Sequence, residues 1–164
     1  MNNGELYFAG AGGNGEGGNS TTNTRYYWSR VAANETVDWY NNTIPRSFNE
    51  SRIVKVASSC QNSTAGATST WAIDEQGGVW CWGYNGYGNL GLGQGTPGNS
   101  NNQSSPGLPS FSHFSNINKP VKMPQGLFDY KRIVDIYAFG GGSGGNCHFL
   151  DEDGNLWGVG NVNN

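Results

Sequence analysis

The sequence is organised around a segment rich in glycine and aromatic residues that occurs three times. The middle copy, Gly77–Gly91, reads G-G-V-W-C-W-G-Y-N-G-Y-G-N-L-G, and Gly4–Gly18 and Gly154–Asn164 carry the same pattern. A gapless superposition aligns the following residues: Gly77 with Gly4 and Gly154, Gly83 with Gly10 and Gly160, Gly88 with Gly15, Gly91 with Gly18, and Trp80 with Tyr7 and Trp157. Repetition at a fixed period indicates a fold built from similar units that pack on one another.

A second segment repeats upstream of the first. Arg52–Ala57 (R-I-V-K-V-A) matches Arg132–Tyr137 (R-I-V-D-I-Y), and each copy leads through a bend rich in Gly and Ser into a strand that ends in acids. The offset from Val54 to Val134 sets a period of about 80 residues. Short apolar runs between turn residues predict eight strands. These are Glu5–Ala9, Thr22–Val31, Ile53–Ala57, Ser69–Ile73, Val79–Trp82, Ile133–Tyr137, Cys147–Leu150 and Leu156–Val159.

The order of these segments resembles the repeat of the regulator of chromosome condensation family. The shared pattern is V-x-x-V/I, a small-residue bend, a strand, an acid–Gly turn, apolar-W/Y-x-x-G and x-N-x-x-G-x-L-G, and it covers residues 1–18, 52–93 and 120–164. Members of that family fold as β-propellers, so the resemblance implies propeller blades. The family's His-Ser pair is replaced by Ser69-Thr70 in the middle copy and by Asn146-Cys147 in the last. The resemblance therefore bears on architecture more than on activity.

We expect one all-β, propeller-like domain over residues 1–164, made of short antiparallel strands. Within it we place a partial blade at 1–31, the best-defined blade at 52–93, a low-complexity loop at 94–119 and a second partial blade at 120–164. Propellers close with 4–8 blades, and one repeat cannot bury its own apolar face. We therefore expect an incomplete ring in one chain. Three arrangements would complete the fold. Copies of the chain could assemble into a ring, the chain could be one piece of a longer propeller, or its blades could stack on other subunits.

Charge and composition narrow the classes of partner. The formal net charge is −3, and the nine Lys and Arg residues form no run longer than Lys131-Arg132. Nucleic-acid binding needs clustered cations that displace counterions, so we expect no nucleic-acid partner. No run approaches the ~18 apolar residues of a membrane span, and residues 1–20 lack the basic start and apolar core of a signal peptide. We therefore expect no membrane span and no signal peptide.

No group of residues has the spacing of a catalytic or metal site. Gly10–Gly15 matches G-x-G-x-x-G, but the residues that follow are poor helix formers and the dinucleotide motif requires a helix there. Asp151–Gly154 begins like a calcium loop without its closing glutamate, so an acidic β-turn is expected. Cys147 and His148 should point to opposite faces of a strand. We expect no cofactor, no metal and no enzymatic activity, and a buried thiol at Cys81.

Exposed aromatic side chains are the remaining functional candidates. A ring beside an asparagine can stack on the apolar face of a sugar while the amide bonds its hydroxyls. The alternative is that such rings seal contacts between blades. The candidate binding surface comprises Tyr84, Asn85, Tyr87, Asn89, Phe111, His113 and Phe114.

Two function classes follow. The first is a non-enzymatic structural or binding subunit, such as a virion, phage-appendage or surface protein. It would assemble with other protein subunits through its blades and have surface glycan as a further ligand. Its expected location is the virion or cell surface, and otherwise the cytoplasm. The second is implied by the family resemblance: a regulatory protein-interaction module, which includes nucleotide exchange on a small GTPase.

Overall fold

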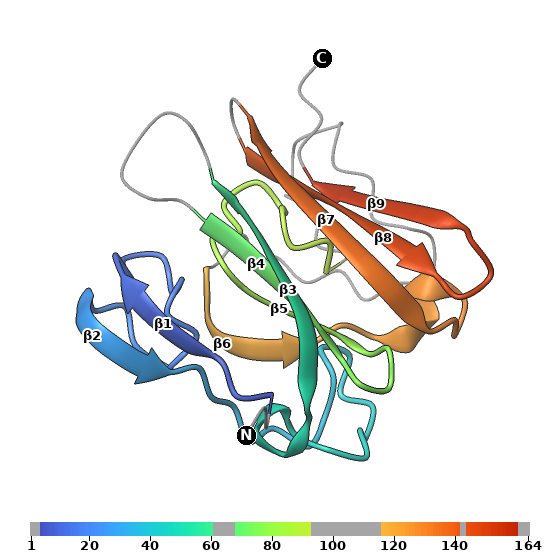
Figure 1. The fold of residues 1–164 in the computed structure, drawn as a ribbon, viewed down its shortest axis with the longest axis horizontal. Coiled ribbons are helices and arrows are strands. Elements are labelled where there is room, and N and C mark those ends of the chain that lie inside the picture. The colour runs from blue at the N-terminus through green and yellow to red at the C-terminus, as the bar shows by residue number, and fades with distance from the viewer. Residues whose placement is uncertain (1–3, 61–67, 93–115, 142–143, 161–164) are drawn as a thin grey trace.

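The computed structural model describes residues 4–60, 68–92, 116–141 and 144–160, and these form three small antiparallel sheets (Figure 1). The first sheet is β1 (Tyr7–Gly10) and β2 (Arg25–Arg30). The middle sheet is β3 (Ile53–Cys60), β4 (Thr68–Asp74), β5 (Val79–Gly83) and β6 (Ile117–Lys122). The last sheet is β7 (Ile133–Gly141), β8 (Gly144–Asp151) and β9 (Leu156–Gly160). The all-β prediction with propeller-type blades is confirmed, and the described strands form no closed ring.

Helical structure in these ranges is confined to two short 3-10 turns, Phe48–Glu50 and Gln125–Phe128. Neither they nor any other described helix has the length and apolar character needed to cross a membrane. Within each sheet every strand pairs with its neighbours in sequence. The blades are therefore simple meanders, and the turns between strands decide the register.

All eight predicted strands are present, with ends that differ by a few residues. One further described strand, β6, was not predicted, because it contains Pro120 and follows a low-complexity stretch. Proline is tolerated on an edge strand, and β6 is the edge of the middle sheet. Residues 117–122 were assigned in the sequence partly to a loop and partly to the last blade. The structure places them in the middle sheet instead.

The repeat seen in the sequence reappears in the backbone. Every aligned glycine has a positive φ: Gly4, Gly77 and Gly154; Gly10, Gly83 and Gly160; Gly15 and Gly88; Gly18 and Gly91. Other residues are strained in that conformation, which explains why glycine recurs at these offsets. The register also shifts at aligned places, after Ile53 and Ile133 in the first strand pair of two sheets. The three sheets are therefore versions of one unit.

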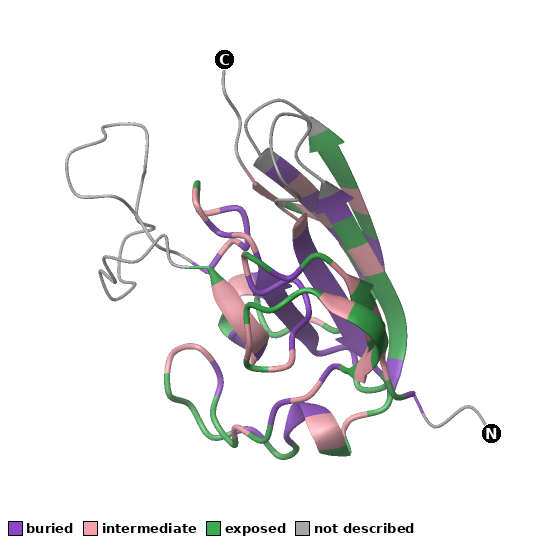
Figure 2. Cartoon of the chain, turned by 90° about the vertical axis from the view of Figure 1, so that its left-hand side faces the viewer, coloured by how far each residue is buried: buried purple, intermediate pink, exposed green. Residues whose placement is uncertain are grey.

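Both faces of the central strands of the middle sheet, β4 and β5, are covered. The first junction, between the first and middle sheets, buries Trp80 and Trp82 against Phe48. The second junction, between the middle and last sheets, buries Trp71 and Cys81 among apolar side chains that include Phe149. The buried thiol predicted at Cys81 is thus present. Figure 2 shows buried residues concentrated in the central strands. Burial on both faces explains why β4 and β5 lack the alternation of a half-exposed strand.

Candidate interaction surfaces

The loop that follows β5 contains the four described members of the candidate binding surface. Asn85 and Asn89 are almost fully buried, at 1% and 0% exposure. The backbone N–H of Leu90 donates to Asn85 Oδ1 (3.1 Å), and Asn89 Nδ2 donates to the Gly145 carbonyl (3.2 Å). These amides close the loop and attach it to the last sheet, because buried backbone groups need polar partners. From these positions they do not face solvent, where a sugar would bind.

Tyr84 and Tyr87 remain at the surface of the same loop. Their ring centroids are 6.2 Å apart at an interplanar angle of 64°. Tyr87 is about half exposed, and burial raises the pKa of the partly covered Tyr84. The other predicted members, Phe111, His113 and Phe114, lie outside the described residues. The structure therefore groups two tyrosines of the candidate surface and places its two asparagines in the interior.

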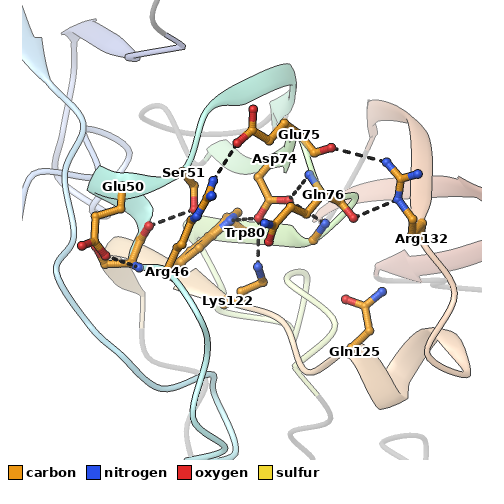
Figure 3. Close-up of polar contacts among 12 residues, drawn as sticks. Arg46, Glu50, Ser51, Asp74, Glu75, Gln76, Trp80, Lys122, Gln125 and Arg132 are labelled. Carbon is orange, nitrogen blue, oxygen red and sulfur yellow. Dashed lines mark hydrogen bonds and ion pairs between the residues drawn. The ribbon is translucent and has the colours of Figure 1, made fainter.

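A buried polar cluster at the β4–β5 turn joins three strands of the middle sheet, and we call it the middle clasp (Figure 3). Asp74 Oδ2 accepts from the indole Nε1 of Trp80 and from Lys122 Nζ, both at 2.9 Å. Asp74 Oδ1 accepts from the backbone N–H groups of Gln76 and Gly78. The Lys122 ammonium also lies 5.0 Å from the centroid of the Trp80 ring. The carboxylate thus joins β4, the turn, β5 and the edge strand β6.

The last sheet repeats this cluster without the lysine, and we call it the last clasp. Asp151 Oδ2 accepts from Trp157 Nε1 at 2.9 Å and from Asn155 Nδ2 at 3.0 Å. Asp151 Oδ1 accepts from the backbone N–H groups of Asp153 and Asn155. Burial of Asp151 acts to raise its pKa, but these hydrogen bonds outweigh that effect and lower the pKa to about 2. Within the described residues Asp151 forms no ion pair.

The acidic β-turn predicted at Asp151–Gly154 is present, with Asp151 as the last residue of β8, as Asp74 is of β4. The sequence analysis did not identify the tryptophan partners of these two aspartates. The signal was present, because each aspartate precedes a tryptophan by six residues, as Asp74…Trp80 and Asp151…Trp157. The lysine of the middle clasp lies 48 residues from its aspartate, and no local pattern indicates it.

A groove lies at the first junction, beside β1. Its cavity of about 430 Å³ is lined by Phe8 and Gly10 of the first sheet and by Val56, Thr70 and Trp82 of the middle sheet. At the second junction the equivalent face of β7 and β8 packs against β3 and β4 of the middle sheet. No described strand precedes β1 in the first sheet. Val56 is therefore 47% exposed, whereas Ile136, aligned with it in the last sheet, is 4% exposed.

The outer face of the last sheet is also apolar and open. Tyr137, Leu150 and Leu156 are exposed there. The residues aligned with them in the middle sheet, Ala57, Ile73 and Val79, belong to the second junction. The outer face of the last sheet therefore corresponds to the face of the middle sheet that packs against the last sheet. Exposed apolar patches of this kind mark interaction sites.

A further cavity, of about 680 Å³, lies between the loop around Asp38, the turn at Gln76 and the segment that follows β6. Its charged lining groups are already engaged. Asp38 accepts hydrogen bonds from Tyr40 and Asn42 of its own loop, and Lys122 belongs to the middle clasp. In the described part of the chain no three His, Cys, Asp or Glu side chains gather as metal ligands would.

No protein-family model and no curated protein matches the sequence. Solved structures do match, and one of them is the crystal structure of human WBSCR16, with a TM-score of 0.60 and 19% sequence identity over 98% of this chain. The chain spans 29% of the WBSCR16 chain. At that identity the likeness concerns the fold alone, and it relates the three sheets to a segment of that larger structure.

Proposed function

We propose that this chain is a non-enzymatic protein-interaction module made of propeller blades of the regulator of chromosome condensation type. In this proposal, incomplete sheets bind other polypeptides. The observation that carries it is the groove at the first junction. β3 and β4 cover the equivalent surface of the last sheet at the second junction, and β1, which pairs with no described strand except β2, lies beside the groove.

Open strand edges and apolar faces support a protein as the partner. An unpaired edge offers backbone N–H and C=O groups to another strand, and β1 pairs only with β2 among the described strands. The apolar lining of the groove includes Val56, Phe8 and Trp82, and its polar lining includes Glu16 and Thr70. A partner hairpin placed there would meet the kind of surface that β7 and β8 offer to β3 and β4.

Of the two function classes, we favour the regulatory module over the virion or phage appendage. One solved structure with a similar fold is that of a human protein, whereas the virion or cell-surface setting rests on composition alone. Nucleotide exchange on a small GTPase is the regulatory activity that the family resemblance suggests. A nucleotide-release assay with a panel of small GTPases would examine that activity.

The groove is tested by a synthetic hairpin of residues 52–74, which contains β3 and β4, the strands that cover the aligned Ile136 at the second junction. We expect the hairpin to bind the purified chain in calorimetry, and Val56→Lys to abolish binding because it places a charge in the groove. Val54→Lys is the matched control, since Val54 is exposed on the same strand but does not line the groove. Equal binding by both variants, or no binding by the wild type, would count against the proposal.

A further inference from the structure

The two clasps differ in one respect, which is the presence of a fourth strand. In the middle sheet β6 pairs with β5 and contributes Lys122 to Asp74. In the last sheet β9 is the outermost described strand, and Asp151 is held by uncharged donors alone. The last sheet therefore has a carboxylate in the position where the middle sheet has an ion pair.

The register of the middle sheet defines where an added strand would lie. β5 and β6 are antiparallel, with Trp80 opposite Lys122 and Cys81 opposite Val121. The repeat aligns Trp80 with Trp157. An antiparallel strand added to β9 in the same register would therefore place one of its residues opposite Trp157.

The first sheet supports a basic residue at that place independently. Tyr7 aligns with Trp80, and the residue opposite Tyr7 on β2 is Arg30. Arg30 forms an ion pair with Glu5 at 2.9 Å. The edge strands β2 and β6 thus each place a cation, Arg30 or Lys122, opposite the aligned aromatic residue of the neighbouring strand.

We propose that the edge of β9 binds an extended strand of a separate polypeptide whose residue opposite Trp157 is lysine or arginine. The cation pairs with Asp151 and lies over the Trp157 ring. This inference rests on the proposed function, because it names the partner chemistry of one incomplete sheet. It concerns a surface other than the groove at the first junction.

The chemistry of the site favours a cation for two reasons. The Asp151 side chain is almost fully buried, at 1% exposure, yet remains charged, and such a carboxylate attracts a cation more strongly than a solvated one. The Trp157 ring is partly exposed, and an ammonium or guanidinium group over an indole face gains a cation–π contact. Lys122 makes both contacts in the middle sheet.

Asn155 controls access to this position. It aligns with Gly78, where a Cβ would lie 2.4 Å from Lys122 Nζ. The Asn155 side chain therefore stands near the place that the cation takes in the middle clasp. Because Asn155 is exposed, its amide can turn aside when the cation arrives. Removing this side chain should strengthen binding.

The test uses the full chain and a fluorescent peptide with the sequence of residues 116–124, N-I-N-K-P-V-K-M-P, followed by anisotropy. A second peptide carries Lys122→Gln. We expect the lysine peptide to bind at least tenfold more tightly than the glutamine peptide, and added salt to reduce that preference. Asp151→Asn should remove the preference, whereas Asp153→Asn in the same turn should retain it. The Asn155→Gly variant should bind the lysine peptide several-fold more tightly than the wild type does.

Several outcomes would overturn the proposal. The first is equal affinity of the wild type for the two peptides. The second is an equal loss of affinity for both peptides in Asp151→Asn. The third is no binding of the lysine peptide at millimolar concentration. If Asp151→Asn does not fold, as judged by circular dichroism, the peptide preference and the response to Asn155→Gly still decide the matter. Self-association of the chain without peptide, in native mass spectrometry, would assign the edge to a second copy and overturn the separate partner. Val56→Lys should leave peptide binding unchanged, so failure of the groove and failure of this site are distinguishable.

Discussion

The indole N–H of Trp80 donates to the carboxylate of Asp74 across 2.9 Å, and Lys122 reaches the same oxygen from the edge strand. This contact connects a turn, two central strands and the edge of the sheet. Its counterpart in the last sheet has the same Asp–Trp distance. The clasp is therefore part of the repeating unit, and its differences between sheets indicate where strands are added.

We predict that Asp74→Ala destabilises the protein by roughly 3 kcal/mol, because it leaves the buried Lys122 ammonium without its counter-ion. Urea unfolding followed by tryptophan fluorescence measures this. Glu75→Ala is the control, since the Glu75 side chain forms an exposed ion pair with Arg46 and its removal should change stability by less than about 1 kcal/mol. Similar losses in the two variants would contradict a structural role for the middle clasp.

The stability contributed by Asp151 should depend on pH. Its pKa is about 2 in the folded chain, below the ordinary value of 3.8. A depressed pKa stabilises the fold above the unfolded-state pKa, and this contribution is lost as pH falls from about 4 towards 2. The difference in unfolding free energy between wild type and Asp151→Asn should therefore shrink over that interval. Glu152→Gln serves as the control, and a difference for Asp151→Asn that is constant from pH 5 to pH 2 would refute the expectation.

Gly83→Ala should destabilise the chain by about 2 kcal/mol or more. Gly83 has φ +97°, and an added Cβ would lie 2.3 Å from the Thr68 carbonyl oxygen. Gly13→Ala is the matched control, because no heavy atom lies within 4 Å of a Cβ at that position. Thermal unfolding of both variants tests this, and equal melting temperatures would show that backbone conformation is not what requires glycine at 83.

Val79 and Leu156 occupy aligned positions and should respond differently to truncation. Val79 is fully buried at the second junction, whereas Leu156 is 67% exposed on the last sheet. We expect Val79→Ala to cost about 2 kcal/mol through lost burial and a cavity. Leu156→Ala should stay within about 0.5 kcal/mol. Chemical denaturation of the isolated chain gives both values, and an equal cost would mean that the outer face is covered in solution.

Much of the fold was predictable because its signals are local. Eight strands were predicted from apolar runs between turn residues, and each is present. β6 was missed because Pro120 suppresses a strand signal, although an edge strand accepts proline. The site was less predictable, since the sequence does not show whether Asn85 and Asn89 face solvent or the interior.

The sequence by itself determined the turns and the repeat, because a positive φ at Gly10, Gly83 and Gly160 is a local requirement that glycine meets best. Only the tertiary structure decided which residues meet. Lys122 reaches Asp74 from 48 residues away, and Asn89 bonds Gly145 from 56 residues away. Such contacts depend on how sheets pack and on which edges remain open. The same packing buries Val79 and leaves Leu156 exposed, although the two occupy one position in the repeat.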